Sequence, residues 1–67
     1  MSVIALEDLL HQRFMKEKAK FPMTQQVYWP LFFGWSSPFR DRLVYEGYWV
    51  TDHGHYVMIR WDEYIVN

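Results

Sequence analysis

The stretch that decides the fold spans residues 42–66 and reads RLVYEGYWVTDHGHYVMIRWDEYIV. Residues 42–51 and 55–66 are both rich in β-branched and aromatic side chains, which favour strands. Asp52-His53-Gly54 separates them. A three-residue loop with glycine at its third position is typical of a type I turn closed by a left-handed glycine bulge. The stretch therefore predicts an antiparallel β-hairpin in which Gly54 has a positive φ.

That turn also predicts how the two strands pair. Trp49 would lie opposite Val57, and Glu46 would lie opposite Arg60 as a favourable charge pair. One face of the hairpin is then a core face, with Leu43, Tyr45, Trp49, Val57, Ile59 and Trp61. The opposite face is mixed, with Glu46, Tyr48, Val50, Tyr56, Met58, Arg60, Asp62 and Tyr64.

Residues 3–20 have the pattern of an amphipathic helix. Its apolar stripe consists of Val3, Leu6, Leu10, Phe14 and Phe21, a spacing that predicts one core-facing side. Ser2 is a candidate N-cap, and Pro22 ends the helix because the residue before a proline is pushed out of the α region. Acidic residues near the start and lysines near the end complement the helix dipole.

The segment between the helix and the hairpin is harder to assign. Residues 27–33 are apolar with neither a helical nor a strand period, and Pro30 excludes a central strand and disfavours a helix interior. We therefore interpret 27–33 as an edge strand or a covering loop. Residues 36–41 predict a short helical turn with Ser37 as its cap and Pro38 in the first position.

These elements predict a single α+β domain over residues 1–67. An N-terminal amphipathic helix packs on a small antiparallel sheet built around the C-terminal hairpin. The composition agrees, since 51% of the residues are hydrophobic and the aromatic residues are four Trp, five Tyr and five Phe. Disordered chains are poor in aromatic residues.

Charge and residue types exclude several classes of function. A formal net charge of −1 lacks the basic excess of a duplex-binding domain and the acidic excess of a DNA mimic. There is no cysteine, so neither a disulfide framework nor a thiol nucleophile is available. No apolar run approaches the ~20 residues of a membrane span. We expect no secretory leader, because Met1-Ser2-Val3-Ile4 lacks the positive charge and the uninterrupted apolar stretch of one. We expect a cytoplasmic protein without a membrane partner.

The candidate chemical groups are few. Asp52, His53 and His55 could ligate one metal ion, but the same residues are ordinary in a solvated turn. Ser36 and Ser37 do not lie in a Gly-x-Ser-x-Gly elbow, and no glycine-rich phosphate loop is present. We therefore expect no enzyme activity, no catalytic residue, no metal site and no cofactor.

The mixed face of the hairpin is the candidate binding surface. The residues expected to contact a partner are Tyr48, Tyr56, Met58, Arg60 and Tyr64. Protein interfaces favour Tyr, Met and Arg. The sequence thus predicts a small non-catalytic protein-binding module, such as an inhibitor, adaptor or assembly factor of the kind that phages and mobile elements use as accessory proteins. The alternative is single-stranded nucleic-acid binding by aromatic stacking on the same face, which the near-neutral charge makes less favoured. A homodimer, or residues 27–33, could also cover this face.

Overall fold

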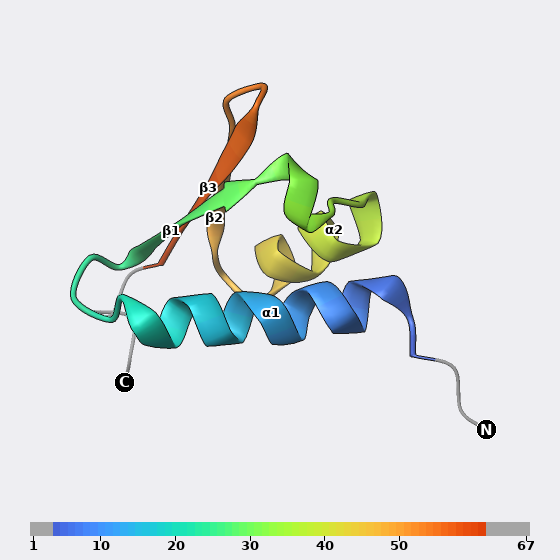
Figure 1. The fold of residues 1–67 in the computed structure, drawn as a ribbon, viewed down its shortest axis with the longest axis horizontal. Helices are drawn as coiled ribbons and strands as arrows, with labels where there is room; N and C mark the ends of the chain where they lie inside the picture. Colours follow the sequence, from blue (N-terminus) through green and yellow to red (C-terminus); the bar gives the residue numbers. More distant parts are fainter. Residues whose placement is uncertain (1–3, 62–67) are drawn as a thin grey trace.

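The structure is a computed structural model that describes residues 4–61. In chain order its elements are α1 (Leu6–Lys20), β1 (Gln26–Pro30), the 3₁₀ turn η1 (Leu31–Phe33), α2 (Ser37–Tyr45), β2 (Trp49–Asp52) and β3 (Tyr56–Arg60). Figure 1 shows α1 running along one side of the sheet, while the tip of the β2–β3 hairpin projects away from it. The predicted α+β class, with an N-terminal helix and a C-terminal hairpin, is confirmed. No helix within residues 4–61 is long and apolar enough to cross a bilayer.

The sheet has the order β1-β3-β2, and both neighbours run antiparallel to β3. The segment predicted as an edge strand or covering loop does supply an edge strand, which is Gln26–Pro30. Pro30 ends that strand, and the remaining residues of the segment form η1. Because proline has no N–H to donate, an edge position tolerates it.

Both helices cover the same face of the sheet. Val27 lies opposite Ile59 and Trp29 lies opposite Val57, so these four buried side chains point to one side. The core that they form with the helices consists of Leu10, Phe14, Val27, Trp29, Phe39, Leu43, Val57, Ile59 and Trp61. The opposite face receives no helix among the described residues.

Helix α1 begins later than predicted. Its cap position is Ala5, which makes no side-chain cap hydrogen bond, and the predicted N-cap, Ser2, lies outside the described residues. Glu7 and Asp8 occupy the first turn and Lys18 and Lys20 the last, which confirms the arrangement that favours the helix dipole. The buried stripe is narrower than the apolar pattern suggests, because it contains Leu10 and Phe14, whereas Leu6 and Phe21 are exposed.

The predicted strand over residues 42–51 is wrong in its first half, because α2 continues through Tyr45. The helix ends in a Schellman motif, in which Gly47 N–H donates to Val44 O and Tyr48 N–H donates to Leu43 O, both at 3.0 Å. Gly47 has a φ of +97°, a conformation that this motif requires and that glycine adopts without strain. Leu43 is therefore a core residue from a helix, and Tyr45 is exposed.

The predicted pairing of the hairpin is also wrong. Trp49 lies opposite Arg60, three residues along from the predicted Val57, and Val50 lies opposite Ile59. A shift by an odd number of residues exchanges the two faces of a strand. Trp49 therefore points away from the core and is 50% exposed.

The turn explains this change of register. His53 N–H donates to Tyr56 O (2.9 Å), and Gly54 N–H donates to the side chain of Asp52 (2.8 Å). Gly54 has the predicted positive φ, at +91°. The closing pair is nevertheless His53 with Tyr56, so the loop is tighter than the predicted three-residue loop.

Ser36, and not the predicted Ser37, caps helix α2. Its hydroxyl accepts a hydrogen bond from Phe39 N–H at 3.3 Å. Replacing Ser36 with alanine should lower the free energy of unfolding by about 1 kcal/mol, because a first-turn N–H loses its partner. Replacing the exposed Ser37 should change it by about 0.5 kcal/mol or less. Urea denaturation followed by circular dichroism would compare the two variants, and an equal loss from both would contradict the assignment.

Candidate functional site

The face of the sheet that points away from both helices is the main candidate. We call it the outer sheet face and define it by Gln26, Tyr28, Trp49, Thr51, Tyr56, Met58 and Arg60. These side chains share one face because Met58 lies opposite both Tyr28 and Thr51, and Arg60 lies opposite Trp49. Tyr28 is 57% exposed and Trp49 50%, so two large aromatic side chains reach solvent here.

Three of the predicted binding residues lie together on this face. Tyr56, Met58 and Arg60 alternate along β3, the central strand. Tyr48 does not join them, because its ring packs edge-on against Phe14 with centroids 4.9 Å apart. Tyr64 lies outside the described residues.

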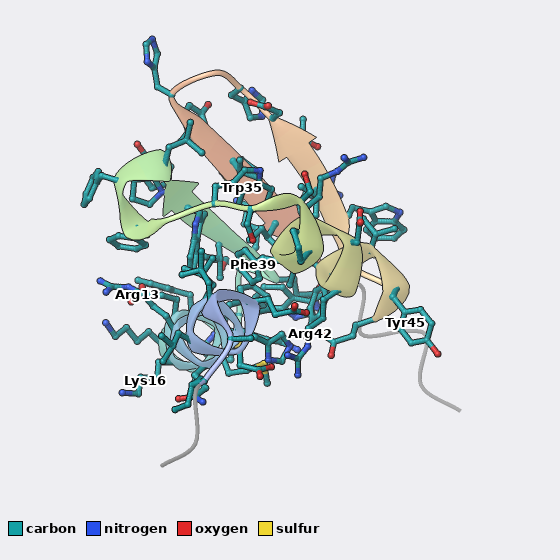
Figure 2. The ribbon with its side chains drawn as sticks, turned by 90° about the vertical axis from the view of Figure 1, so that its right-hand side faces the viewer. Arg13, Lys16, Trp35, Phe39, Arg42 and Tyr45 are labelled. Carbon is teal, nitrogen blue, oxygen red and sulfur yellow. The ribbon has the colours of Figure 1, made fainter. Side chains whose placement is uncertain are left out.

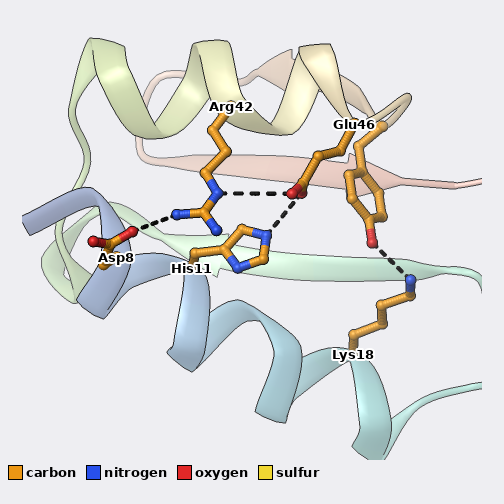
Figure 3. A network of polar contacts seen from close by, with 6 residues as sticks. Asp8, His11, Lys18, Arg42 and Glu46 are labelled. Atoms are coloured by element: carbon orange, nitrogen blue, oxygen red, sulfur yellow. Dashed lines mark hydrogen bonds and ion pairs between the residues drawn. The ribbon is translucent and has the colours of Figure 1, made fainter.

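Tyr48 instead contacts residues of α1. Figure 3 shows its hydroxyl accepting a hydrogen bond from Lys18, with 2.7 Å between the two atoms. The Lys18 ammonium also lies 5.0 Å from the centroid of the Trp61 ring. Tyr48 therefore links the C-terminal half of α1 to the edge of the core.

Sequence reasoning missed four residues of this surface, which are Gln26, Thr51 and the two large aromatic residues Tyr28 and Trp49. Trp49 was missed because the predicted register of the hairpin placed it on the core face. Tyr28 was lost because residues 27–33 were treated as one apolar block. The usable signal was the alternation from Gln26 to Trp29, where exposed and buried positions follow one another as in a half-buried strand.

A row of stacked rings crosses the outer sheet face. The ring centroids of Tyr28 and Tyr56 are 4.7 Å apart, and those of Tyr56 and His53 are 4.8 Å apart with the planes inclined by 13°. Because β1 and β2 flank β3 on opposite sides, the two neighbours of Tyr56 cover both sides of its ring. The row therefore offers ring edges, rather than open ring planes, at its centre.

A hollow adjoins this row at the edge formed by β1. It has a volume of about 210 Å³ and is lined by Phe21, Thr24, Gln26, Tyr28 and Met58. Its wall is mostly apolar, and Phe21 is half exposed beside it. A hollow of this size and lining can accept one apolar side chain of a partner.

Arg60 is the charged side chain of the outer sheet face. Its guanidinium lies 5.8 Å from the centroid of the Trp49 ring, within the range of a cation–π contact. The predicted pair with Glu46 is wrong, since Glu46 is the C-cap residue of α2 and its carboxylate lies 2.7 Å from His11 Nε2. The face therefore carries a positive charge without the predicted acidic neighbour.

The remaining polar cluster joins the two helices. Arg42 lies between Asp8, whose carboxylate is 2.5 Å away, and Glu46, at 3.7 Å (Figure 3). His11 completes the chain of contacts from α1. Every member of the cluster pairs with another member, so the arrangement fastens α1 to α2.

The hairpin tip does not assemble a metal site in the structure. The side chain of Asp52 accepts the Gly54 N–H, and His53 stacks on Tyr56. Within residues 4–61, no group of three or more His, Cys, Asp or Glu side chains is placed to hold a metal ion. Comparison of the chain with models of protein families, with curated proteins and with solved structures gives no match.

Proposed function

We propose that the protein is a small non-catalytic protein-binding module, an inhibitor, adaptor or assembly factor, that recognises its partner through the outer sheet face. One observation carries the proposal: both helices pack on one side of the sheet, and the other side exposes Tyr28, Trp49 and Arg60 around the half-buried Tyr56 and Met58. A contiguous apolar patch larger than a few hundred Å² is rare on a monomeric protein and usually marks a binding site. Interfaces favour these residue types.

The arrangement of the rings favours a protein partner over stacked bases. Single-stranded nucleic acid is bound on open aromatic planes, but Tyr56 has a neighbouring ring on each side. A protein surface can pack against ring edges and place a side chain in the adjacent hollow. The face then resembles the centre of an interface, where buried aromatic residues contribute most of the binding energy.

Single-stranded nucleic acid is the second candidate, and one observation favours it. Glu46 lies away from the outer sheet face, so the acidic residue that was predicted opposite Arg60 is not beside it. Tyr28 is 57% exposed although its ring stacks on that of Tyr56. The candidate is weaker because a single arginine supplies little of the phosphate neutralisation on which such binding depends.

We place this activity in the cytoplasm and regard an accessory protein of a phage or mobile element as a fitting setting. The chain has no cysteine, so nothing in it depends on an oxidising compartment. A homodimer formed through the same face is the competing arrangement, because a symmetric interface needs only one self-complementary patch. Sedimentation at two concentrations separates a dimer from a free monomer.

The experiment compares partner capture by three forms of the immobilised protein. Wild type and the Tyr45→Ala variant should retain one stoichiometric protein from nuclease-treated lysate, since Tyr45 is 91% exposed but lies on α2. The double variant Tyr28→Ala/Trp49→Ala should bind that protein at least about 30-fold more weakly, the loss expected when interface anchors are truncated. Arg60→Ala should weaken it as well.

The controls decide between the two candidates. Capture without nuclease that yields nucleic acid, and that fails as salt is raised, would favour the second candidate. If Tyr45→Ala abolished capture while the double variant kept it, the outer sheet face would not be the site. Circular dichroism of each variant confirms that the fold is kept.

A further inference from the structure

A second surface lies on α1, away from the sheet. We call it the cationic flank and define it by Leu6, Leu9, Arg13, Lys16 and Lys20, all of which are exposed. Their spacing of three and four residues places them on one side of the helix. Figure 2 shows Arg13 and Lys16 projecting from α1 on the side opposite Arg42 and Tyr45.

The charges on this flank are mostly of one sign. Glu17 is the acidic residue beside it, and its carboxylate lies 3.2 Å from Lys20 Nζ. Asp8 is bound to Arg42 on another side of the helix, and Lys18 is engaged by Tyr48. Three cations therefore accompany one acid here, in a chain whose formal net charge is −1.

Apolar side chains protrude beside these cations. The guanidinium of Arg13 lies 3.8 Å above the centre of the Phe33 ring, which fixes η1 against α1. Next to Phe33 stands Phe32, which is 86% exposed. Leu6 and Leu9 are about half exposed on the helix itself. Cations and protruding apolar groups thus share one side of the molecule.

We propose that the cationic flank, together with Phe32, docks on the surface of a membrane rich in anionic phospholipids. Anionic head groups attract a row of basic side chains, and apolar side chains enter the boundary between head groups and acyl chains. The cations extend over about 10 Å of helix around an open hollow of about 360 Å³ that Leu9, Arg13, Lys16 and Lys20 help to line.

This geometry suits mobile head groups better than an acidic peptide. A peptide carboxylate is frequently held by two parallel N–H donors of one arginine. Here the Arg13 guanidinium is stacked on Phe33, and Lys16 and Lys20 place single ammonium groups on long stems around an open hollow. We expected no membrane partner because no apolar run is long enough to span a bilayer. Docking on the surface of a membrane does not need such a run. Docking by this flank leaves the outer sheet face free, because α1 and that face lie on opposite sides of the sheet.

The test is sedimentation of the full chain with vesicles. Vesicles of phosphatidylcholine alone should bind little protein. Vesicles with about a third phosphatidylserine should bind it in a salt-sensitive manner. Lys16→Gln should lower the partition coefficient about five-fold, and Glu17→Gln should raise it about five-fold, since each changes the flank by one charge. Phe32→Ser should lower it on phosphatidylserine vesicles without altering the circular dichroism spectrum.

A matched control removes the same charge elsewhere. Arg60→Gln changes the outer sheet face and should leave vesicle binding as in wild type. Equal binding to both vesicle types, or no gain from Glu17→Gln, would overturn the proposal. Binding of polyglutamate that depends on Lys16, without vesicle binding, would assign the flank to an acidic protein instead. None of these results bears on partner capture by the outer sheet face, so the two proposals fail separately.

Discussion

Replacing Trp29 with alanine should lower the free energy of unfolding by about 3–5 kcal/mol. Trp29 is fully buried at the centre of the core, where its ring contacts those of Phe33 and Phe39 at centroid distances of 5.2 and 5.3 Å. Its indole N–H donates to Gly34 O at 2.8 Å. Domains of this size have a total stability of a few kcal/mol, so the variant should be largely unfolded at room temperature.

Trp49 supplies the matched control, because it is the same residue type on the opposite face of the sheet. Trp49→Ala should change the free energy of unfolding by about 1 kcal/mol or less, since its ring is half exposed and contacts Arg60 at 5.8 Å. Urea titrations followed by far-ultraviolet circular dichroism would measure both variants. A large loss from Trp49→Ala would support the register with Trp49 opposite Val57 and contradict the one described here.

Replacing Gly34 with alanine should lower the free energy of unfolding by about 2–6 kcal/mol, for two separable reasons. Gly34 has a φ of +112°, which L-residues adopt with a strain of about 1–3 kcal/mol. A Cβ atom there would also lie 2.9 Å from Leu10 Cδ2, and such overpacking costs about 1–3 kcal/mol. Thermal and urea denaturation would measure the loss.

Gly47 separates these two contributions. Its φ is +97°, but an added Cβ would meet no atom within 4 Å. Gly47→Ala should therefore lose only the backbone contribution, about 1–2 kcal/mol. Introducing Gly34→Ala into a Leu10→Val background should bring its loss close to that of Gly47→Ala. An unchanged loss would show that contact with Leu10 is not the cause.

The fold class could be predicted because the sequence patterns that indicate it each lie within a short segment. The apolar spacing of α1 and the glycine turn at Gly54 are each contained in a few adjacent residues. The register could not be predicted in the same way. A glycine with positive φ suits both a three-residue loop and a tighter one. The pairing of His53 with Tyr56 also depends on which face of β2 packs against the core.

The helix ending at Tyr45 was missed for a related reason. Leu43, Val44 and Tyr45 have side chains that favour strands, yet Leu43 is buried in the core as part of α2. The signals that could have revealed it were Pro38 near the start of the helix and Gly47 just past its end. Tertiary packing overrides the weak local preference of such short segments.

The candidate surface was predictable along one strand only. Tyr56, Met58 and Arg60 share a face through the alternation of β3 itself, whatever its partners. Tyr28 and Trp49 join that face only because their strands pair with β3. Pairing between strands cannot be predicted from the pattern of residues within one strand. Tyr48 was included because it was assigned to a strand that does not extend so far.

The central position of β3 also sets an order of assembly. β2 reaches β3 across one tight turn, so this hairpin can close early and at little entropic cost. β1 pairs Gln26 with Arg60, so its closure brings together residues that are separated in the chain by a helix and the hairpin. Long-range pairing of this kind slows folding. We therefore expect the docking of β1 to be the late step, during which Val27 and Trp29 are briefly uncovered.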